Sequence, residues 1–208
     1  MKKVMYIEAS PRKSRSHSMK VANAYIEKIK EKDSNIEIKT IDLWNYNLPE
    51  FNGDMLDAKY SVIAGTDPTE DQKKAWSNVS KIFEEFSSAD HYVFSVPMWN
   101  FNIPYKLKHY IDIVTQPGMS WSYTPDEGYK GLMSGRTATV IYASGDGYGE
   151  GTGFESYDLQ KPYIELWLAF IGFDKVEKVI ADRTLFEPEE SEKRASDVAQ
   201  KLANSHSL

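Results

Sequence analysis

A regular alternation of strand-like and helix-like segments runs along the whole chain and constrains its fold more than any other feature. Short apolar segments with the composition of buried strands alternate with segments whose apolar residues recur at helical spacing. The five strand-like segments are 3–10, 36–44, 91–98, 136–144 and 175–183. Strands that alternate with helices predict an α/β protein with a mainly parallel sheet and helices on both of its faces.

Chain length narrows the choice of architecture. The 208 residues fit one domain, 1–208, large enough to bury a substantial core, and no repeat, low-complexity tract or linker divides them. We therefore expect a flavodoxin-like three-layer sandwich, in which a five-stranded parallel sheet of order 2-1-3-4-5 lies between two helical layers. The polar stretch 45–66 is left open, with a short helix as one alternative, and 118–131 is expected to be an aromatic loop.

Two helix starts are predicted from capping patterns. Asp67 is expected as an N-cap, with Pro68 at the first helical position and Glu70 three residues after the cap. Asn102 is expected to cap the following helix, whose first turn contains Pro104.

Composition and charge exclude several functions. A formal net charge of −6 argues against nucleic-acid binding, which usually needs a basic face. The absence of cysteine excludes disulfides, thiolate nucleophiles and cysteine-ligated metals. The histidines show no HExxH or i, i+4 spacing, so no metal site is predicted. A strand begins within the first residues instead of a signal peptide, and no apolar run approaches the roughly 20 residues of a membrane span, so we expect a cytoplasmic protein without a membrane partner.

Three unusual loops follow the first, third and fourth predicted strands. They are "ASPRKSRSHS" at 9–18, "VPMWNFN" at 96–102 and "ASGDGYGEGTG" at 143–153. Because the carboxyl ends of parallel strands meet at one edge of a sheet, the topology brings these loops together. Their convergence predicts a ligand-binding site.

The first loop combines serines and cations at the start of a helix, where unpaired N–H groups and the helix dipole attract anions. Each serine alone is explained as well by helix capping, but Ser16 and Ser18 together with Ser10 and Arg12 favour a phosphate site. The GxxxxGK[ST] pattern is absent, so the anion is expected to belong to a cofactor and not to be a transferable phosphate. The cations at positions 13 and 15 are expected to be solvent-exposed.

The other two loops favour a flat, aromatic ligand. Trp99 and Phe101 beside Asn100 form a potential stacking surface with exposed amides. The third loop contains glycine at every second position from 145 to 153, but position 150 is Glu150, so the GxGxxG fingerprint is absent and a Rossmann NAD site is disfavoured. The alternatives are ordinary core aromatics in the second loop and mere flexibility in the third.

These loops also carry a resemblance to a known family. "ASPRKSRSHS", "PMWNFNIPYKLKHYID" and "YASGDG" together resemble the FMN-dependent NADH-azoreductases, also described as NADH:quinone oxidoreductases. The resemblance extends over essentially the whole chain, including "GYKGLMSGRTATVI" and "LAFIGF". The "PMWNF" block followed by a helix containing Leu and Lys is its most specific element.

The resemblance implies a bound FMN, NADH as electron donor and no catalytic side chain or metal, because the flavin supplies the chemistry. It implies a homodimer with the flavin near the subunit boundary. It also implies a ping-pong reaction, in which NADH passes a hydride to flavin N5 and leaves before a quinone or azo compound takes two electrons. The implied contacts are Ser10, Ser16, His17 and Ser18 for the phosphate and ribityl chain; Pro97, Met98, Trp99, Asn100 and Phe101 for the ring edge; Ser144, Gly145, Asp146 and Gly147 for the pyrimidine side; and Phe101 and Tyr123 for the nicotinamide or substrate.

One residue departs from the family pattern. The family usually shows S-x-G-G after the fourth strand, and here the residues are "SGDG", with Asp146 in place of a glycine. A carboxylate near the pyrimidine edge repels the anionic reduced flavin, so we expect a lower reduction potential. The sequence leaves two other functions open: a flavodoxin-type electron carrier without turnover of its own, and a nucleotide-binding redox sensor. Greater length and the aromatic loops disfavour the carrier.

Overall fold

The computed structural model describes residues 2–67 and 69–206. Its main sheet has five parallel strands in the order β2-β1-β3-β6-β7, which is the predicted 2-1-3-4-5 order of the strand-like segments. The strands are β1 (Lys3–Glu8), β2 (Glu37–Asp42), β3 (His91–Pro97), β6 (Thr137–Ala143) and β7 (Lys175–Ala181). The predicted flavodoxin-like sheet is therefore confirmed.

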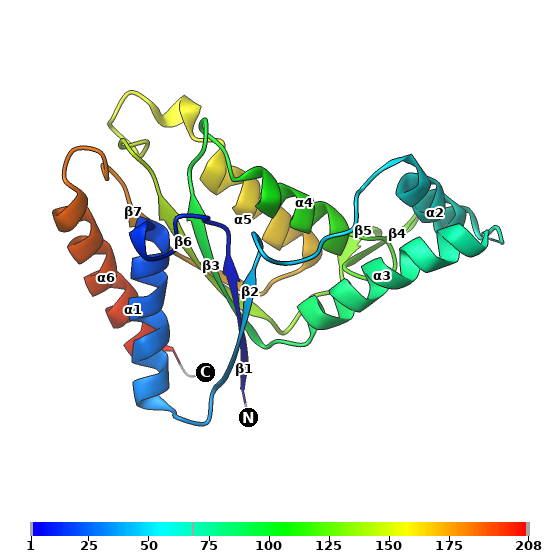
Figure 1. The fold of residues 1–208 in the computed structure, drawn as a ribbon, viewed down its shortest axis with the longest axis horizontal. Helices are drawn as coiled ribbons and strands as arrows, with labels where there is room; N and C mark the ends of the chain where they lie inside the picture. The colour runs from blue at the N-terminus through cyan, green and yellow to red at the C-terminus, as the bar shows by residue number, and fades with distance from the viewer. Residues whose placement is uncertain (1, 68, 207–208) are drawn as a thin grey trace.

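Helices cover both faces of this sheet, as Figure 1 shows. The α-helices are α1 (His17–Lys32), α2 (Gly53–Ala64), α3 (Glu70–Ser87), α4 (Tyr105–Val114), α5 (Gln160–Ile171) and α6 (Pro188–Ser205), with short 3₁₀ helices η1 (Lys13–Arg15) and η2 (Glu155–Tyr157). Helices α1 and α6 lie side by side on one face, whereas α3, α4 and α5 lie on the other. The result is the expected three-layer sandwich.

The central strands are continuously apolar because both of their faces are covered. Along β3, Tyr92 and Phe94 point into the core beneath α3, α4 and α5, whereas Val93 points into the core beneath α1 and α6. All three side chains are fully buried. Burying each such side chain contributes about 1.5–3 kcal/mol to folding.

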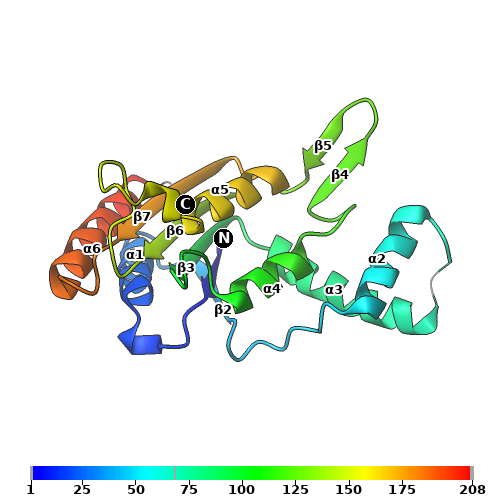
Figure 2. The same cartoon turned by 90° about the horizontal axis from the view of Figure 1, so that it is seen from above.

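Two segments outside the sheet add structure beyond the prediction. The open stretch 45–66 contains α2, which packs on α3 at the end of the molecule far from α1, so the helical alternative is confirmed. The segment 118–131 is not a simple loop, and that expectation was wrong. It forms an antiparallel hairpin of β4 (Trp121–Thr124) and β5 (Gly128–Gly131), which projects from the main body in Figure 2.

Both predicted helix caps are wrong. Thr69 is the N-cap of α3: its hydroxyl accepts a hydrogen bond from the Gln72 N–H, and the Gln72 side chain accepts one from the Thr69 N–H. This reciprocal box displaces Asp67 as the cap, and Pro68 lies outside the described residues. Helix α4 begins at Tyr105, because Asn102 pairs its backbone with Trp99 in a separate turn.

Candidate functional site

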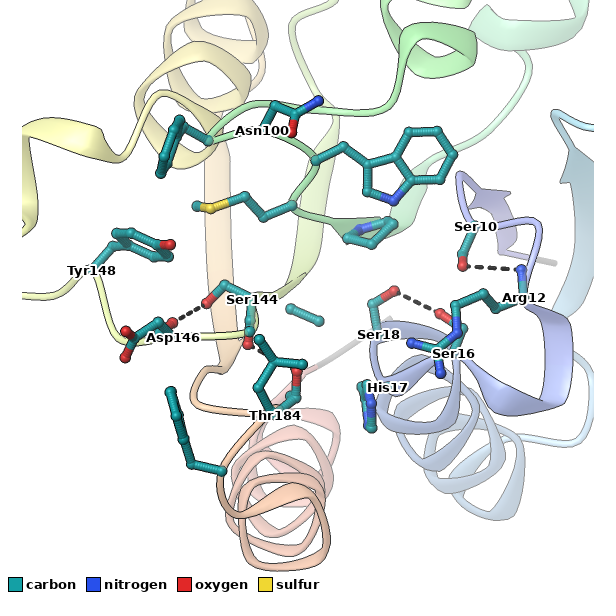
Figure 3. Close-up of a pocket in the computed structure, with 18 residues that line it drawn as sticks. Ser10, Arg12, Ser16, His17, Ser18, Asn100, Ser144, Asp146, Tyr148 and Thr184 are labelled. Carbon is teal, nitrogen blue, oxygen red and sulfur yellow. Dashed lines mark hydrogen bonds between the residues drawn. The ribbon is translucent and has the colours of Figure 1, made fainter.

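A cavity of about 530 Å³ opens at the carboxyl edge of the sheet, between α1 and the loops that follow β3 and β6. The three loops selected from the sequence meet there. Its lining comprises Ser10, Arg12, Ser16, His17, Ser18, Pro97, Met98, Trp99, Asn100, Phe101, Ala143, Ser144, Gly145, Asp146, Tyr148, Thr184, Leu185 and Phe186. In Figure 3 the serines, Arg12 and His17 occupy one side and the Ser144–Tyr148 loop the other, with Asn100 above them.

The first loop brings buried hydroxyl groups to the start of α1. Ser10, Ser16 and Ser18 are each no more than 2% exposed. The Oγ atoms of Ser16 and Ser18 lie 3.2 Å apart, and Ser10 Oγ accepts a hydrogen bond from the Arg12 N–H. Ser16 stands at the N-cap position, but its side chain makes no capping hydrogen bond. Helix capping therefore does not account for these serines. The first turn of α1 also contains no acidic residue that would repel an anion.

Lys13 anchors this loop to the sheet. Its Nζ lies 2.8 Å from a carboxylate oxygen of Glu8 and 2.6 Å from one of Asp42, at the ends of β1 and β2. Partial burial alone would lower the pKa of Lys13, but hydrogen bonds to Asp42 and Glu8 outweigh it and raise that pKa. Lys13 is therefore paired with two carboxylates while its side chain stays 41% exposed, and Arg15 is exposed as expected.

The second loop makes a tight turn at the end of β3. The Trp99 N–H donates to the Asn102 carbonyl at 2.7 Å, and the Asn102 N–H donates back to the Trp99 carbonyl at 3.0 Å. The two central residues have positive φ, +47° at Asn100 and +70° at Phe101, as in a type I′ turn. A phenylalanine in this conformation costs about 1–2 kcal/mol. This strained conformation places Asn100 and Phe101 at the cavity. Backbone strain of this kind is concentrated at functional sites.

The third loop is held by short hydrogen bonds of its own. The Ser144 hydroxyl donates to the Asp146 carbonyl at 2.7 Å, and an Asp146 carboxylate oxygen accepts the Gly147 N–H at 2.7 Å. These bonds fix the Asp146 side chain at the cavity wall (Figure 3). Tyr148 continues the wall and contacts Phe101 edge-to-face, with ring centroids 6.2 Å apart.

A fourth segment, which the sequence did not select, completes the cavity. Thr184, Leu185 and Phe186 connect β7 to α6. The N–H groups of Thr184 and Leu185 donate to the carbonyls of Ser144 and Gly145, each at 3.1 Å, and extend the pairing of β6 with β7 past the ends of both strands. The apolar pair Leu185–Phe186 could have indicated this segment. It follows β7, whose carboxyl end lies at the same edge of the sheet as the other three loops.

Comparison with known proteins agrees with this geometry. Residues 2–205 match the family model described as "Flavodoxin-like fold". An FMN-dependent NADH:quinone oxidoreductase of Desulfotalea psychrophila is 48% identical over 185 residues, which cover 89% of this chain and 87% of that protein. The chain belongs to the FMN-dependent NADH:quinone oxidoreductase family. The family resemblance inferred from the three loops is thereby confirmed.

Solved structures named as azoreductases share this fold over their whole length. The azoreductase from Bacillus anthracis str. Sterne superposes with a TM-score of 0.90 at 30% identity, covering 99% of this chain and 100% of that one. An FMN-dependent NADH-azoreductase from Bacillus anthracis str. Ames Ancestor, in complex with FMN, gives a TM-score of 0.88 at 30% identity and covers 98% of each chain. Within the family, FMN-dependent NADH:quinone oxidoreductase 3 of Pseudomonas fluorescens is 37% identical, covering 98% of this chain and 96% of the relative.

Two residues expected at the family's site lie off the cavity wall. Gly147 is buried behind the wall, where its N–H holds the Asp146 carboxylate. Tyr123 lies on the β4–β5 hairpin, 56% exposed, with its ring 5.0 Å from that of Tyr129. The hairpin projects from the far end of the molecule (Figure 2), so Tyr123 does not wall the cavity of its own chain.

Residues 2–67 and 69–206 contain neither a candidate metal site nor a helix that could span a membrane. No three His, Asp or Glu side chains of this part of the chain gather closely enough to hold a metal ion. Of its helices, none is both long and apolar enough to span a membrane.

Proposed function

We propose that this member of the family binds FMN in the 530 Å³ cavity and uses NADH to reduce quinones or azo compounds. One observation carries the proposal: buried serines at the start of α1 share a single cavity with the aromatic turn after β3 and the Ser144–Asp146 loop. Its volume is within the roughly 300–1,000 Å³ of small-molecule sites. The relatives, named as FMN-dependent reductases, favour an enzyme over a flavodoxin-type carrier.

The residues present suit the two ends of FMN. At one end, the hydroxyls of Ser10, Ser16 and Ser18, with His17, surround unpaired N–H groups of a helix start, which is a phosphate-binding environment. At the other end, apolar and aromatic side chains with backbone amides suit a flat heterocycle with nitrogen and oxygen acceptors. The ring-facing set is Pro97, Met98, Trp99, Asn100, Phe101, Ser144, Gly145 and Asp146, with Gly147 supporting Asp146 from behind.

Bound FMN would supply the hydride and electron transfer, so the side chains need only bind, orient and exclude water. The strained turn at Asn100 and Phe101 places one wall of the ring site and leaves Phe101 45% exposed toward an incoming donor or acceptor. Lys13 keeps the first loop, which would hold the phosphate, attached to the ends of β1 and β2. No cavity residue has to act as a nucleophile or general acid.

We further propose a homodimer. Large aromatic and apolar side chains are exposed away from the cavity: Tyr105 and Tyr123 are 62% and 56% exposed, and Tyr129 and Leu166 are 67% and 70% exposed. A second groove of about 570 Å³ runs beside Tyr105 and Tyr163. Apolar patches of this kind mark protein interfaces. In a dimer formed through this face, Tyr123 would wall the cavity of a second copy, which reconciles its expected role with its position here.

The proposal includes a cytoplasmic address without nucleic-acid or membrane partners, which the net charge of −6 and the absence of cysteine support. Light scattering after gel filtration tests the dimer: we expect twice the mass of a 23.8 kDa chain. In that dimer, Tyr123→Ala should raise the KM for quinone while leaving FMN content unchanged. A monomeric mass would contradict this part of the proposal.

The absorbance spectrum of the purified protein tests the cofactor. We expect bands at roughly 370 and 450 nm from a flavin that heating releases. NADH oxidation should then depend on an added quinone, and a carrier or a sensor would show almost no such turnover. A protein that remains colourless after incubation with FMN would overturn the proposed function.

A further inference from the structure

A charged cluster beside the phosphate end of the cavity is not explained by the family resemblance. His17, in the first turn of α1, lines the cavity, and its Nδ1 lies 2.5 Å from a carboxylate oxygen of Glu192 on α6. The Nζ of Lys20, one turn further along α1, lies 2.9 and 3.1 Å from the two carboxylate oxygens of Glu192. The side chains of His17 and Glu192 are only 18% and 21% exposed.

The contact determines which nitrogen of His17 is available to a ligand. A carboxylate accepts hydrogen bonds only, so the proton on Nδ1 is donated to Glu192 and the ring orientation is fixed. Within the described part of the chain, Nε2 of His17 has no hydrogen-bond partner. A phosphate dianion also accepts hydrogen bonds only, so Nε2 can bind it as a donor when the ring is protonated.

We propose that Glu192 is a positioning residue of the FMN site. It holds His17 through Nδ1, so that Nε2 can donate a hydrogen bond to the cofactor phosphate. This inference rests on the proposed function. Glu192 itself does not line the cavity and acts only through His17.

The charges around the pair keep Glu192 ionised. Burial of Glu192 would raise its pKa, but hydrogen bonds from Lys20 and His17 outweigh that effect and lower the pKa, so the group stays a carboxylate near neutrality. Lys20 and the cavity residue Arg12 add two cations at this end of the cavity, where they would attract a phosphate dianion.

Other charged groups near this end are either paired or across the cavity. On the connection from β7 to α6, Glu187 pairs with Arg183 at 2.6 Å and with Arg194 at 3.5 Å. Arg194 also approaches Asp182 at 3.9 Å. Asp146 faces His17 from the opposite wall of the cavity. The paired groups largely cancel, so they contribute little to the binding of a phosphate.

A purely structural role is the competing explanation, since the pair also fastens α1 to α6. Calorimetric titration of wild type, His17→Gln and Glu192→Gln with FMN and with riboflavin, each protein flavin-free and full-length, separates the two explanations. Both variants should bind FMN about tenfold more weakly, the usual scale of a lost hydrogen bond to a charged group. Riboflavin, which lacks the phosphate, should bind all three proteins equally.

Glu189→Gln is the matched control, because it removes the same charge from the exposed first turn of α6. It should behave as wild type. Should Glu192→Gln match this control in FMN affinity, Glu192 only connects the two helices, and the inference fails while the proposed function stands. Wild-type protein that binds neither FMN nor riboflavin overturns both. His17→Gln tests the same contact from the other side should a Glu192 variant fold poorly.

Discussion

The hydroxyls of Ser16 and Ser18 lie 3.2 Å apart, and both side chains are no more than 2% exposed. Two buried hydroxyls that bond to each other at a helix start leave the N–H groups of that first turn available. Whichever hydroxyl accepts in this bond keeps its own proton to donate to a further partner, and both keep acceptor capacity. This pair is the part of the cavity best suited to phosphate oxygens, and the first prediction tests it.

Ser18→Ala should weaken FMN binding about tenfold, because a hydrogen bond to a charged oxygen is lost, and should leave riboflavin binding unchanged. Flavin fluorescence during titration measures both affinities. Ser14→Ala is the control, since Ser14 is exposed in the same loop. Equal losses for FMN and riboflavin would show that Ser18 supports the loop and does not contact phosphate.

Asp146→Gly should raise the reduction potential of the bound flavin, because it removes a carboxylate from the wall that we assign to the pyrimidine edge. Asp146→Asn should raise it as well, since the amide oxygen can still accept the Gly147 N–H while the charge is lost. Redox titration of the reconstituted proteins checks this. An unchanged potential in both variants would remove Asp146 from the ring site.

Gly131→Ala should destabilise the protein by about 1–3 kcal/mol or more, the usual cost of overpacking. A Cβ at position 131 would clash with the backbone nitrogen of Gly172, where β5 meets the end of α5. Backbone cannot rotate away as a side chain can, so the hairpin must move. Thermal unfolding measures the effect, and Gly149→Ala, with no atom within 4 Å of its added Cβ, is the control. Equal melting temperatures would contradict the close approach.

Lys13→Gln should lower stability by about 0.5–1 kcal/mol, since the pairs with Asp42 and Glu8 are partly exposed. Burial would raise the pKa of Asp42, but the Lys13 and Asn45 hydrogen bonds lower it below its ordinary 3.8, so its contribution is lost as pH falls through and below that value. The pKa of Lys13 is raised above its ordinary 10.5, so its contribution is lost as pH rises past that value.

The difference in unfolding free energy between wild type and Lys13→Gln should therefore be largest between the ordinary pKa values of Asp42 and Lys13, and it should shrink in acid. Urea unfolding at several pH values measures it. Lys28→Gln, which breaks an exposed i, i+3 pair with Glu31, should cost less at every pH. A Lys13 difference that persists unchanged in strong acid would mean that the ion pairs contribute nothing.

The parallel sheet and the place of the site followed from local patterns, whereas the strand order was expected from the size of the chain. Residues such as Val93 and Phe94 make β3 apolar on both faces, and only a parallel sheet covered by helices buries such a strand. The three loops then had to meet, because parallel strands end at one edge. All predicted contact residues but Gly147 and Tyr123 line the cavity for that reason.

Local patterns failed where several residues compete for one role. Asp67 and Thr69 are both residue types that cap helices. The reciprocal hydrogen bonds between Thr69 and Gln72 make Thr69 the N-cap. Asn102 is a good cap by type, but its backbone is held by Trp99. The aromatic stretch 118–131 forms a hairpin, in which the rings of Tyr123 and Tyr129 face each other across two strands.

The sequence by itself determined the alternating strands and helices, and with them the sheet and the edge at which a ligand binds. Tertiary structure alone decided which distant groups meet there. Thr184 joins the cavity because β7 pairs with β6, and Glu192 reaches His17 across 175 positions because α6 packs on α1. Periodicity is a property of neighbouring residues, whereas such contacts depend on how the completed layers pack.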